Sequence, residues 1–381
     1  MAGIYLHIPF CRQACTYCNF HFSTSLRYKN DVITAMCNEV RQEAGFLGSE
    51  KINTIYFGGG TPSLLDVSDV TLLLSTINEC FTVAEDAEIT IEANPDDIHE
   101  EKLNNWRKIG INRLSLGIQS FSDEELKWMH RAHSSQQAIE SLQLAVQYFE
   151  NITIDLIYGS PFLSDKQWKE NVDRVIGMNI PHISCYALTV EEKTPLFKQI
   201  AGNQSPDVDN DIQANQYLQL MQWLRSAGYE HYEVSNFAKP GFRSRHNSSY
   251  WTGTKYLGIG PSAHSYNGSE RRWNVANNNI YVQQLAKGKP KRETEVLTDS
   301  QKFNEYVMIS LRTSDGLNLD YIKNKWGEKK ANLVQQQLQR NILNEFLRFN
   351  GRRVQLTDEG FLQADRIASD LFDVEKEVAA D

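Results

Sequence analysis

The chain has 381 residues, enough for one large domain and a smaller one, and its hydrophobic content of 41% can build packed cores. The formal net charge of −9 argues against a nucleic-acid binder, because phosphate contacts need a basic surface. The sequence shows no signal peptide and no apolar run long enough to span a bilayer, so we expect a cytoplasmic protein.

Three cysteines lie directly after the first expected strand. Cys11, Cys15 and Cys18 have the spacing C-x3-C-x2-C, which supplies three thiolates and no fourth. A [4Fe–4S] cluster held by three thiolates keeps one iron open for a further ligand. The alternative is a structural zinc site, which takes four protein ligands and would use His21 as the fourth. Tyr17 places an aromatic ring among the cysteines, which favours the cluster with an adenine stacked beside it.

A glycine-rich turn, GGGTP at residues 58–62, follows the second expected strand. Glycines at a strand end allow backbone amides and carbonyls to approach a ligand without hindrance from side chains. A turn of this kind also occurs in ordinary strand-to-helix connections. Together with the cysteines, it indicates a cofactor site.

Short apolar runs alternate with segments of helical periodicity through the first half of the chain. This alternation predicts a parallel sheet with right-handed crossovers, either open and doubly wound or closed into a partial barrel. In both architectures the ligand site lies at the carboxyl ends of the strands, where the cysteines and the glycine turn fall. The six expected strands cover residues 4–10, 52–57, 88–93, 113–119, 152–158 and 183–188, and the helices between them cover residues 28–45, 68–80, 98–109, 136–149 and 165–178.

The second half of the chain has a different pattern. A long helix is expected over 210–228, followed by a polar, aromatic and glycine-rich region. Three helices, a hairpin over 346–356 and a last helix over 357–371 then suggest a winged-helix unit, for which the acidic balance favours packing or partner docking over DNA binding. The predicted division is a core domain at 1–235, a connecting region at 236–298, a C-terminal domain at 299–373 and an acidic tail at 374–381.

Several motifs, in this order, resemble those of the radical S-adenosylmethionine (radical SAM) enzymes: YLHIPFC at 5–11, GGGTP at 58–62 and EANP at 92–95. GIQSF at 117–121, DLIYG at 155–159 and YEVSNFA at 232–238 narrow the resemblance to the group of oxygen-independent coproporphyrinogen III oxidases and related heme chaperones. The resemblance runs from residue 5 to about 372. It implies an α/β fold, a radical SAM partial (β/α)6 TIM-like barrel with a smaller C-terminal, HemN-type, winged-helix-like α+β domain.

The resemblance also assigns cofactor residues. It implies that Cys11, Cys15 and Cys18 hold a [4Fe–4S] cluster whose open iron binds S-adenosylmethionine (SAM). The implied SAM contacts are Tyr5, Gly59, Gly60, Thr61 and Glu92. Oxidases of the group bind a second SAM, and the matching positions here are Tyr17, Gln119, Arg131 and Asp155. Whether one or two SAM molecules bind, and whether SAM is cleaved, stays open at this stage.

Two functions of different classes fit the resemblance. One is the radical decarboxylation of coproporphyrinogen III; the other is binding of heme and its delivery to acceptor proteins, soluble or membrane-associated. Phe20 stands where the oxidase pattern has a fourth cysteine, and the oxidases carry an N-terminal extension that we do not expect here. The HNSSYW stretch at 246–251 matches a heme-binding motif of the chaperones, with His246 as iron ligand and Tyr250 and Trp251 against the macrocycle.

The alternative for His246 is a satisfied, partly buried structural histidine. The three features together favour the heme chaperone, without coproporphyrinogen oxidase activity. A homodimer remains an open alternative to a monomer.

Overall fold

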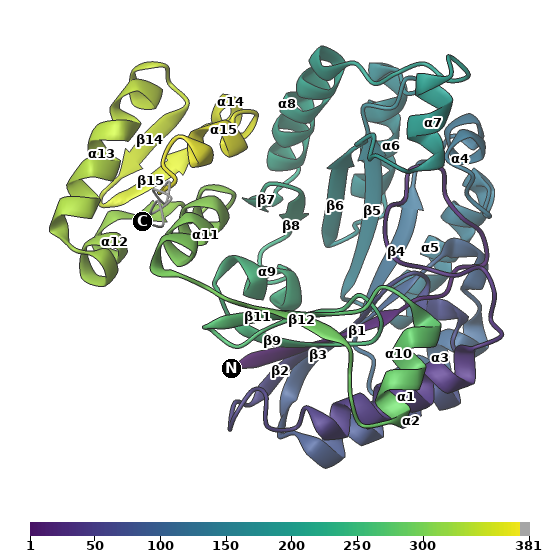
Figure 1. Ribbon diagram of the computed structural model, residues 1–381. Coiled ribbons are helices and arrows are strands. Elements are labelled where there is room, and N and C mark those ends of the chain that lie inside the picture. The colour runs from purple at the N-terminus through teal and green to yellow at the C-terminus, as the bar shows by residue number, and fades with distance from the viewer. Residues whose placement is uncertain (374–381) are drawn as a thin grey trace.

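A twelve-stranded sheet forms the centre of the computed structural model, which describes residues 1–373 (Figure 1). Its middle consists of six parallel strands that neighbour one another in chain order, which confirms the expected α/β architecture. These strands are β1 (Ala2–Ile8), β2 (Ile52–Gly59), β3 (Val83–Ala93), β4 (Arg113–Gln119), β5 (Ile152–Tyr158) and β6 (His182–Ala187).

Helices follow the strands and cover the outer face of the sheet (Figure 1). Three of them begin at a capping box. In this arrangement the side chain of the N-cap residue accepts from the backbone N–H three residues later, and the side chain of that later residue accepts from the N-cap backbone N–H. The helices between the strands are α1 (Lys29–Gln42), α2 (Val67–Cys80), α3 (Glu100–Lys108), α4 (Asp123–Trp128), α5 (Ser135–Tyr148) and α6 (Asp165–Gly177). Only the short α4 was not expected.

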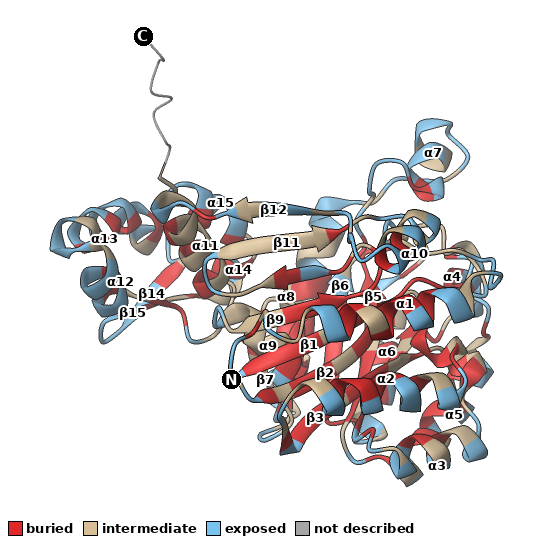
Figure 2. Cartoon of the chain, turned by 60° about the horizontal axis from the view of Figure 1, so that its bottom comes forward, coloured by how far each residue is buried: buried red, intermediate tan, exposed pale blue. Residues whose placement is uncertain are grey.

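The two faces of the parallel strands have different chemistry. On β1, Ile4, Leu6 and Ile8 are fully buried in the hydrophobic core, whereas Tyr5 and His7 point into the interior of the barrel and line a cavity. The parallel strands form the most continuously buried part of the chain (Figure 2). The apolar core therefore lies between sheet and helices, and the concave face is left free for polar side chains.

Residues 236–298, expected as a connecting region, extend the central sheet at both edges. On one side β8 (Asn236–Ala238) pairs antiparallel to β6, and the preceding strand β7 (Glu230–Glu233) pairs antiparallel to β8 at the edge. On the other side β9 (Lys255–Ile259) pairs parallel to β1, and β10 (His264–Tyr266), β11 (Glu270–Asn274) and β12 (Arg292–Val296) follow. These strands have only three to five residues, and β11 and β12 are rich in charged side chains, so they lack the apolar runs that revealed the first six.

Helices α7 (Pro195–Ala201) and α8 (Asn210–Ser226) follow β6, α9 (Arg245–Trp251) carries the HNSSYW stretch, and α10 (Asn278–Ala286) packs on α1. No helix of the described residues 1–373 is both long and apolar enough to cross a membrane.

The C-terminal part forms a second, smaller body beside the barrel (Figure 1). It touches the barrel through backbone hydrogen bonds of the β7–β8 hairpin and through a bidentate ion pair of Arg225 with Asp358, at 3.0 and 2.7 Å. The expected last helix is interrupted between α14 (Asp358–Phe361) and α15 (Ala364–Ser369), and the predicted acidic tail lies outside the described residues. The other elements are α11 (Asp299–Leu311), β13 (Leu317–Asn318), α12 (Leu319–Trp326), α13 (Glu328–Leu343), β14 (Leu347–Asn350) and β15 (Arg353–Leu356).

Candidate functional site

The three cysteines of the N-terminal motif lie on the loop after β1 and line one cavity of about 440 Å³, here called the cluster cavity. Backbone hydrogen bonds hold this loop across the barrel mouth: Thr16 N donates to Met129 O at 3.1 Å, and Leu196 N donates to Thr16 O at 2.9 Å. The loop is therefore fixed by the segments after β4 and β6. The cavity lies at the carboxyl ends of the parallel strands, as predicted.

The residues around the cysteines fit a cluster bound through thiolates. Arg131 is partly buried, and its Nη1 lies 3.4 Å from Cys15 Sγ while its Nη2 donates to Asn94 Oδ1 at 2.8 Å. A guanidinium at this place offsets the negative charge of thiolate ligands. Burial raises the pKa of Cys11 to about 11, a cost that a coordinated metal removes by binding the thiolate.

His21, the fourth ligand of the zinc alternative, lies elsewhere. Its Nε2 is 2.8 Å from Asn278 Oδ1, and its ring stacks on that of His7. It lines a neighbouring cavity and not the cluster cavity. The arrangement of side chains thus favours three cysteine ligands over a closed Cys3His site.

The glycine turn forms one wall of the cluster cavity. Gly60 N donates to Ile8 O at 2.9 Å, and Thr61 N donates to Phe10 O at 2.7 Å. These hydrogen bonds attach the turn to the start of the cysteine loop. A Cβ on Gly60 would lie 2.6 Å from Phe10 O. Glycine is therefore required here by close approach of the cysteine loop backbone, a reason other than the predicted approach to a ligand, which stays a prediction.

Glu92 lies next to the glycine turn, at the end of β3. Its Oε2 accepts from Gly59 N at 3.2 Å and its Oε1 from the Tyr56 hydroxyl at 2.8 Å. Burial, reinforced by Asp155, raises the pKa of Glu92 to about 7. Such a carboxylate sits in a dry site and is suited to accept hydrogen bonds from a ligand.

The four residues matched to a second SAM also line the cluster cavity, namely Tyr17, Gln119, Arg131 and Asp155. Gln119 ends β4 with a φ of 64°, in the left-handed region that a non-glycine residue adopts at some energetic cost. Burial raises the pKa of Asp155 to about 6. Asn94, of the EANP motif, lines the same cavity, and so does Tyr186, which was not predicted although it stands near the end of β6, which was the available signal.

Tyr5 lines a second cavity of about 450 Å³, here called the histidine cavity because His7, His21 and His264 lie in its wall. It shares Gly59 and Glu92 with the cluster cavity, and also Phe20, whose side chain is 65% exposed at the common rim. The remaining lining residues are aromatic or polar: Asn19, Tyr250, Tyr256 and Ser262.

The HNSSYW stretch forms α9, but its histidine points into the protein. His246 is 1% exposed, with Nδ1 2.8 Å from Thr54 Oγ1 and Nε2 3.0 Å from the Tyr250 hydroxyl. Its ring stacks on Tyr56 at 4.9 Å, and burial lowers its pKa to about 3. The structure therefore does not bring His246 to the wall of any cavity described here, whereas Tyr250 and Trp251 reach cavity walls.

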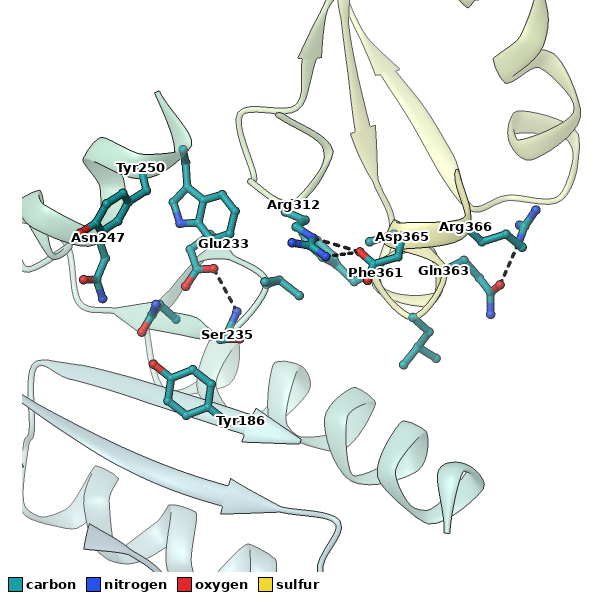
Figure 3. Close-up of a pocket in the computed structure, with 15 residues that line it drawn as sticks. Tyr186, Glu233, Ser235, Asn247, Tyr250, Arg312, Phe361, Gln363, Asp365 and Arg366 are labelled. Carbon is teal, nitrogen blue, oxygen red and sulfur yellow. Dashed lines mark hydrogen bonds and ion pairs between the residues drawn. The ribbon is translucent and has the colours of Figure 1, made fainter. Parts of the chain in front are cut away.

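A third cavity, of about 580 Å³, lies between the barrel and the C-terminal body and is here called the interdomain cavity (Figure 3). Tyr186 is shared with the cluster cavity and Tyr250 with the histidine cavity. Its floor contains two buried oxygen atoms without a hydrogen-bond partner among the described residues, Oε1 of Glu233 and Oδ1 of Asn236. The opposite wall carries Arg312, paired with Asp365.

Glu233 makes the stability of the protein depend on pH. Burial raises its pKa from the ordinary 4.5 to about 7, although Oε2 accepts from Ser235 N at 3.2 Å. Because the folded-state pKa is raised, the contribution of this group to stability is complete below pH 4.5 and is lost as the pH rises to about 7. We expect Glu233→Gln to stabilise the protein at pH 8 relative to pH 5 by about 3 kcal/mol at most.

The measurement is the unfolding temperature of both proteins at the two pH values. The buried carboxyls of Glu92 and Asp155 shift in the same direction, but they are present in both proteins and cancel. Glu192→Gln, at an exposed position, is the matched control. Equal pH dependence of wild type and Glu233→Gln would show that folding does not raise the pKa of Glu233.

Comparison with known proteins agrees with this geometry. The radical SAM superfamily model matches residues 5–175, and the HemN C-terminal domain model matches residues 297–362. The heme chaperone HemW of Mycobacterium tuberculosis (strain ATCC 25618 / H37Rv) is 34% identical over 97% of this chain and 94% of its own. That of Lactococcus lactis is 34% identical over 94% of this chain and 93% of its own.

Among solved structures, coproporphyrinogen III oxidase (HemN) from Escherichia coli superimposes with a TM-score of 0.84 at 23% identity, covering 97% of this chain and 90% of that one. This likeness confirms the expected fold.

Proposed function

We propose that this chain, which belongs to the HemW family of radical SAM proteins, is a heme chaperone. In this function it binds heme and delivers it to acceptor proteins. The acceptors would be reached from the cytoplasm and include soluble and membrane-associated proteins.

The observation that carries the proposal is the position of α9. The helix lies where the histidine cavity and the interdomain cavity meet, and its Tyr250 lines both. Trp251, on the next position, lines the interdomain cavity. Flat aromatic faces at the walls of two adjoining cavities suit a large, flat, mostly apolar ligand such as a porphyrin.

The radical SAM family implies a [4Fe–4S] cluster and SAM. In the proposal, Cys11, Cys15 and Cys18 hold the cluster, which would serve as a one-electron donor when bound. Arg131 balances the thiolate charge, and the cysteine loop excludes water from the cavity.

The glycine turn and Glu92 orient SAM by offering backbone groups and a carboxylate to it, and Tyr5 lies beside it. Tyr17, Gln119 and Asp155 lie in the same cavity, at the positions that a second SAM would use.

The test separates the chaperone from the oxidase. Anaerobically reconstituted protein is titrated with heme, and in parallel it is incubated with coproporphyrinogen III, SAM and a reductant. We expect saturation at about one heme per chain and no protoporphyrinogen IX by mass spectrometry. Repeated turnover to protoporphyrinogen IX would identify an oxidase, the second candidate, which the HemN fold alone supports.

The proposal includes His246 in heme binding through α9. His246 can ligate iron only after its Nε2 is released by the Tyr250 hydroxyl, since both ring nitrogens are engaged. His246→Ala removes both hydrogen bonds and is expected to weaken heme binding about tenfold, which corresponds to about 1.4 kcal/mol. His99→Asn, which keeps an N-cap residue on α3 far from the cavities, is the control for heme titration. Equal heme affinities of His246→Ala and wild type would show that α9 is not part of the heme site.

A further inference from the structure

The histidine cavity contains one imidazole whose two nitrogens are both open. Within residues 1–373, neither ring nitrogen of His264 has a hydrogen-bond partner, and the side chain is exposed at the cavity wall. Of the other imidazoles near this cavity, His21 has one nitrogen engaged, Nε2 at 2.8 Å from Asn278 Oδ1, and the remaining two have both nitrogens engaged. His7 contacts the Tyr5 hydroxyl at 3.2 Å and His21 O at 2.8 Å, and both nitrogens of His246 have partners.

His264 is held in place by its own strand and not by its ring nitrogens. It pairs with Trp273 across the β10–β11 ladder, and the two rings stack at 5.8 Å with an interplanar angle of 21°. Gly258 packs so closely on this strand that a Cβ there would lie 2.0 Å from His264 O. Gly258 N donates to Ser265 Oγ at 2.9 Å. The imidazole is therefore presented on a rigid element while its nitrogens stay free.

The backbone before His264 is anchored to the barrel core. Gly260 N donates to Glu39 Oε2 at 2.9 Å, and Asn274 Nδ2 donates to Gly260 O at 2.9 Å. Between this anchor and His264, Ser262 has a φ of 65° and lines the cavity. This conformation costs free energy in a non-glycine residue, so the surrounding contacts hold the loop in place.

The rest of the cavity wall suits a macrocycle. Tyr250 and Tyr256 supply aromatic surface, and Phe20 stands at the rim with its ring largely exposed. An apolar ring in that position gains by covering an apolar ligand face. Burial, helped by Arg271, lowers the pKa of His264, so the imidazole is neutral near pH 7 and keeps the lone pair that a metal requires.

We propose that His264 is the protein ligand of the heme iron, with the porphyrin lying in the histidine cavity under Phe20. The inference rests on the proposed heme-binding function and deepens it. It places the heme directly beside the cluster cavity, because Phe20, Gly59 and Glu92 belong to both walls. It also assigns a role to Phe20, the residue that stands in place of a fourth cysteine.

The experiment uses the full-length, cluster-reconstituted protein with hemin as the probe, and records the Soret and visible bands of wild type, His264→Ala and His246→Ala. We expect His264→Ala to shift the Soret band and to lose at least tenfold in hemin affinity. Added imidazole should restore the wild-type bands, because it fills the vacated iron position. Unchanged iron and sulfide content of His264→Ala verifies that the variant is folded, and His99→Asn is the matched histidine control.

Two results would overturn the inference, and they are distinguishable. If wild type binds hemin and His264→Ala keeps the same bands while His246→Ala loses them, the iron ligand is His246 and the heme function stands. If wild type does not bind hemin at all, the proposed function itself fails. An unchanged hemin affinity of Phe20→Ser would show that Phe20 at the cavity rim does not contact the porphyrin.

Discussion

Replacing Cys15 with Ala is expected to abolish the iron–sulfur absorbance of the anaerobically reconstituted protein. The cluster cavity offers three thiols, and the variant would leave two, too few to hold a cube with one open iron. The other cysteines cannot substitute, because Cys37 and Cys185 are buried in the hydrophobic core and Cys80 packs against it. Iron and acid-labile sulfide per chain, together with the visible spectrum, measure the loss.

Cys80→Ala is the matched control for this variant, since it removes a thiol of similar accessibility at the end of α2. It should retain wild-type iron and sulfide. Full retention of both by Cys15→Ala would disprove the ligand assignment. Loss of soluble protein in Cys15→Ala but not in Cys80→Ala would mean that the fold requires the cluster. Circular dichroism of the unreconstituted proteins distinguishes this outcome from misfolding caused by the substitution itself.

The second large effect is expected for Gly60→Ala. The new Cβ would lie 2.6 Å from Phe10 O and 2.7 Å from Ile8 O, and backbone atoms cannot rotate away as a flexible side chain does. The glycine turn must then move off the cysteine loop and lose the hydrogen bonds of Gly60 N and Thr61 N. Overpacking of this kind costs about 1–3 kcal/mol, so we expect SAM affinity to fall by about five- to 150-fold.

Equilibrium dialysis or calorimetry with SAM measures the effect on reconstituted protein. Gly177→Ala is the control, because nothing lies within 4 Å of a Cβ at the end of α6, and it should leave SAM affinity unchanged. Equal SAM affinities of Gly60→Ala and Gly177→Ala would mean that the turn does not form the SAM site.

The parallel strands could be predicted because their signal is strong and local. They are short runs of mostly apolar residues, and crossover geometry then fixes where their carboxyl ends meet. That is why residues as distant in sequence as Cys11 and Asp155 could be expected at one site. The edge strands gave no such signal: β12 reads RETEV, with three charged residues in five.

The orientation of α9 could not be predicted from its motif, but part of it was implicit in the spacing. His246 and Tyr250 are four residues apart and thus share a helix face, which is the geometry of their 3.0 Å contact. Which way that face points depends on Thr54 and Tyr56 of β2 and on Glu88, which accepts from His246 N at 2.9 Å. Those partners lie more than 150 residues away, and no local pattern reveals them.

Glu92 and α9 are connected by a short series of contacts that joins two binding regions. Gly59 N and the Tyr56 hydroxyl share the Glu92 carboxylate, Tyr56 stacks on His246, and His246 contacts Tyr250, which lines the other two cavities. Thermodynamic linkage between two binding sites is reciprocal. Under the proposed function, heme therefore changes the affinity for SAM by the same factor by which SAM changes the affinity for heme, and heme release is linked to occupancy of the SAM site.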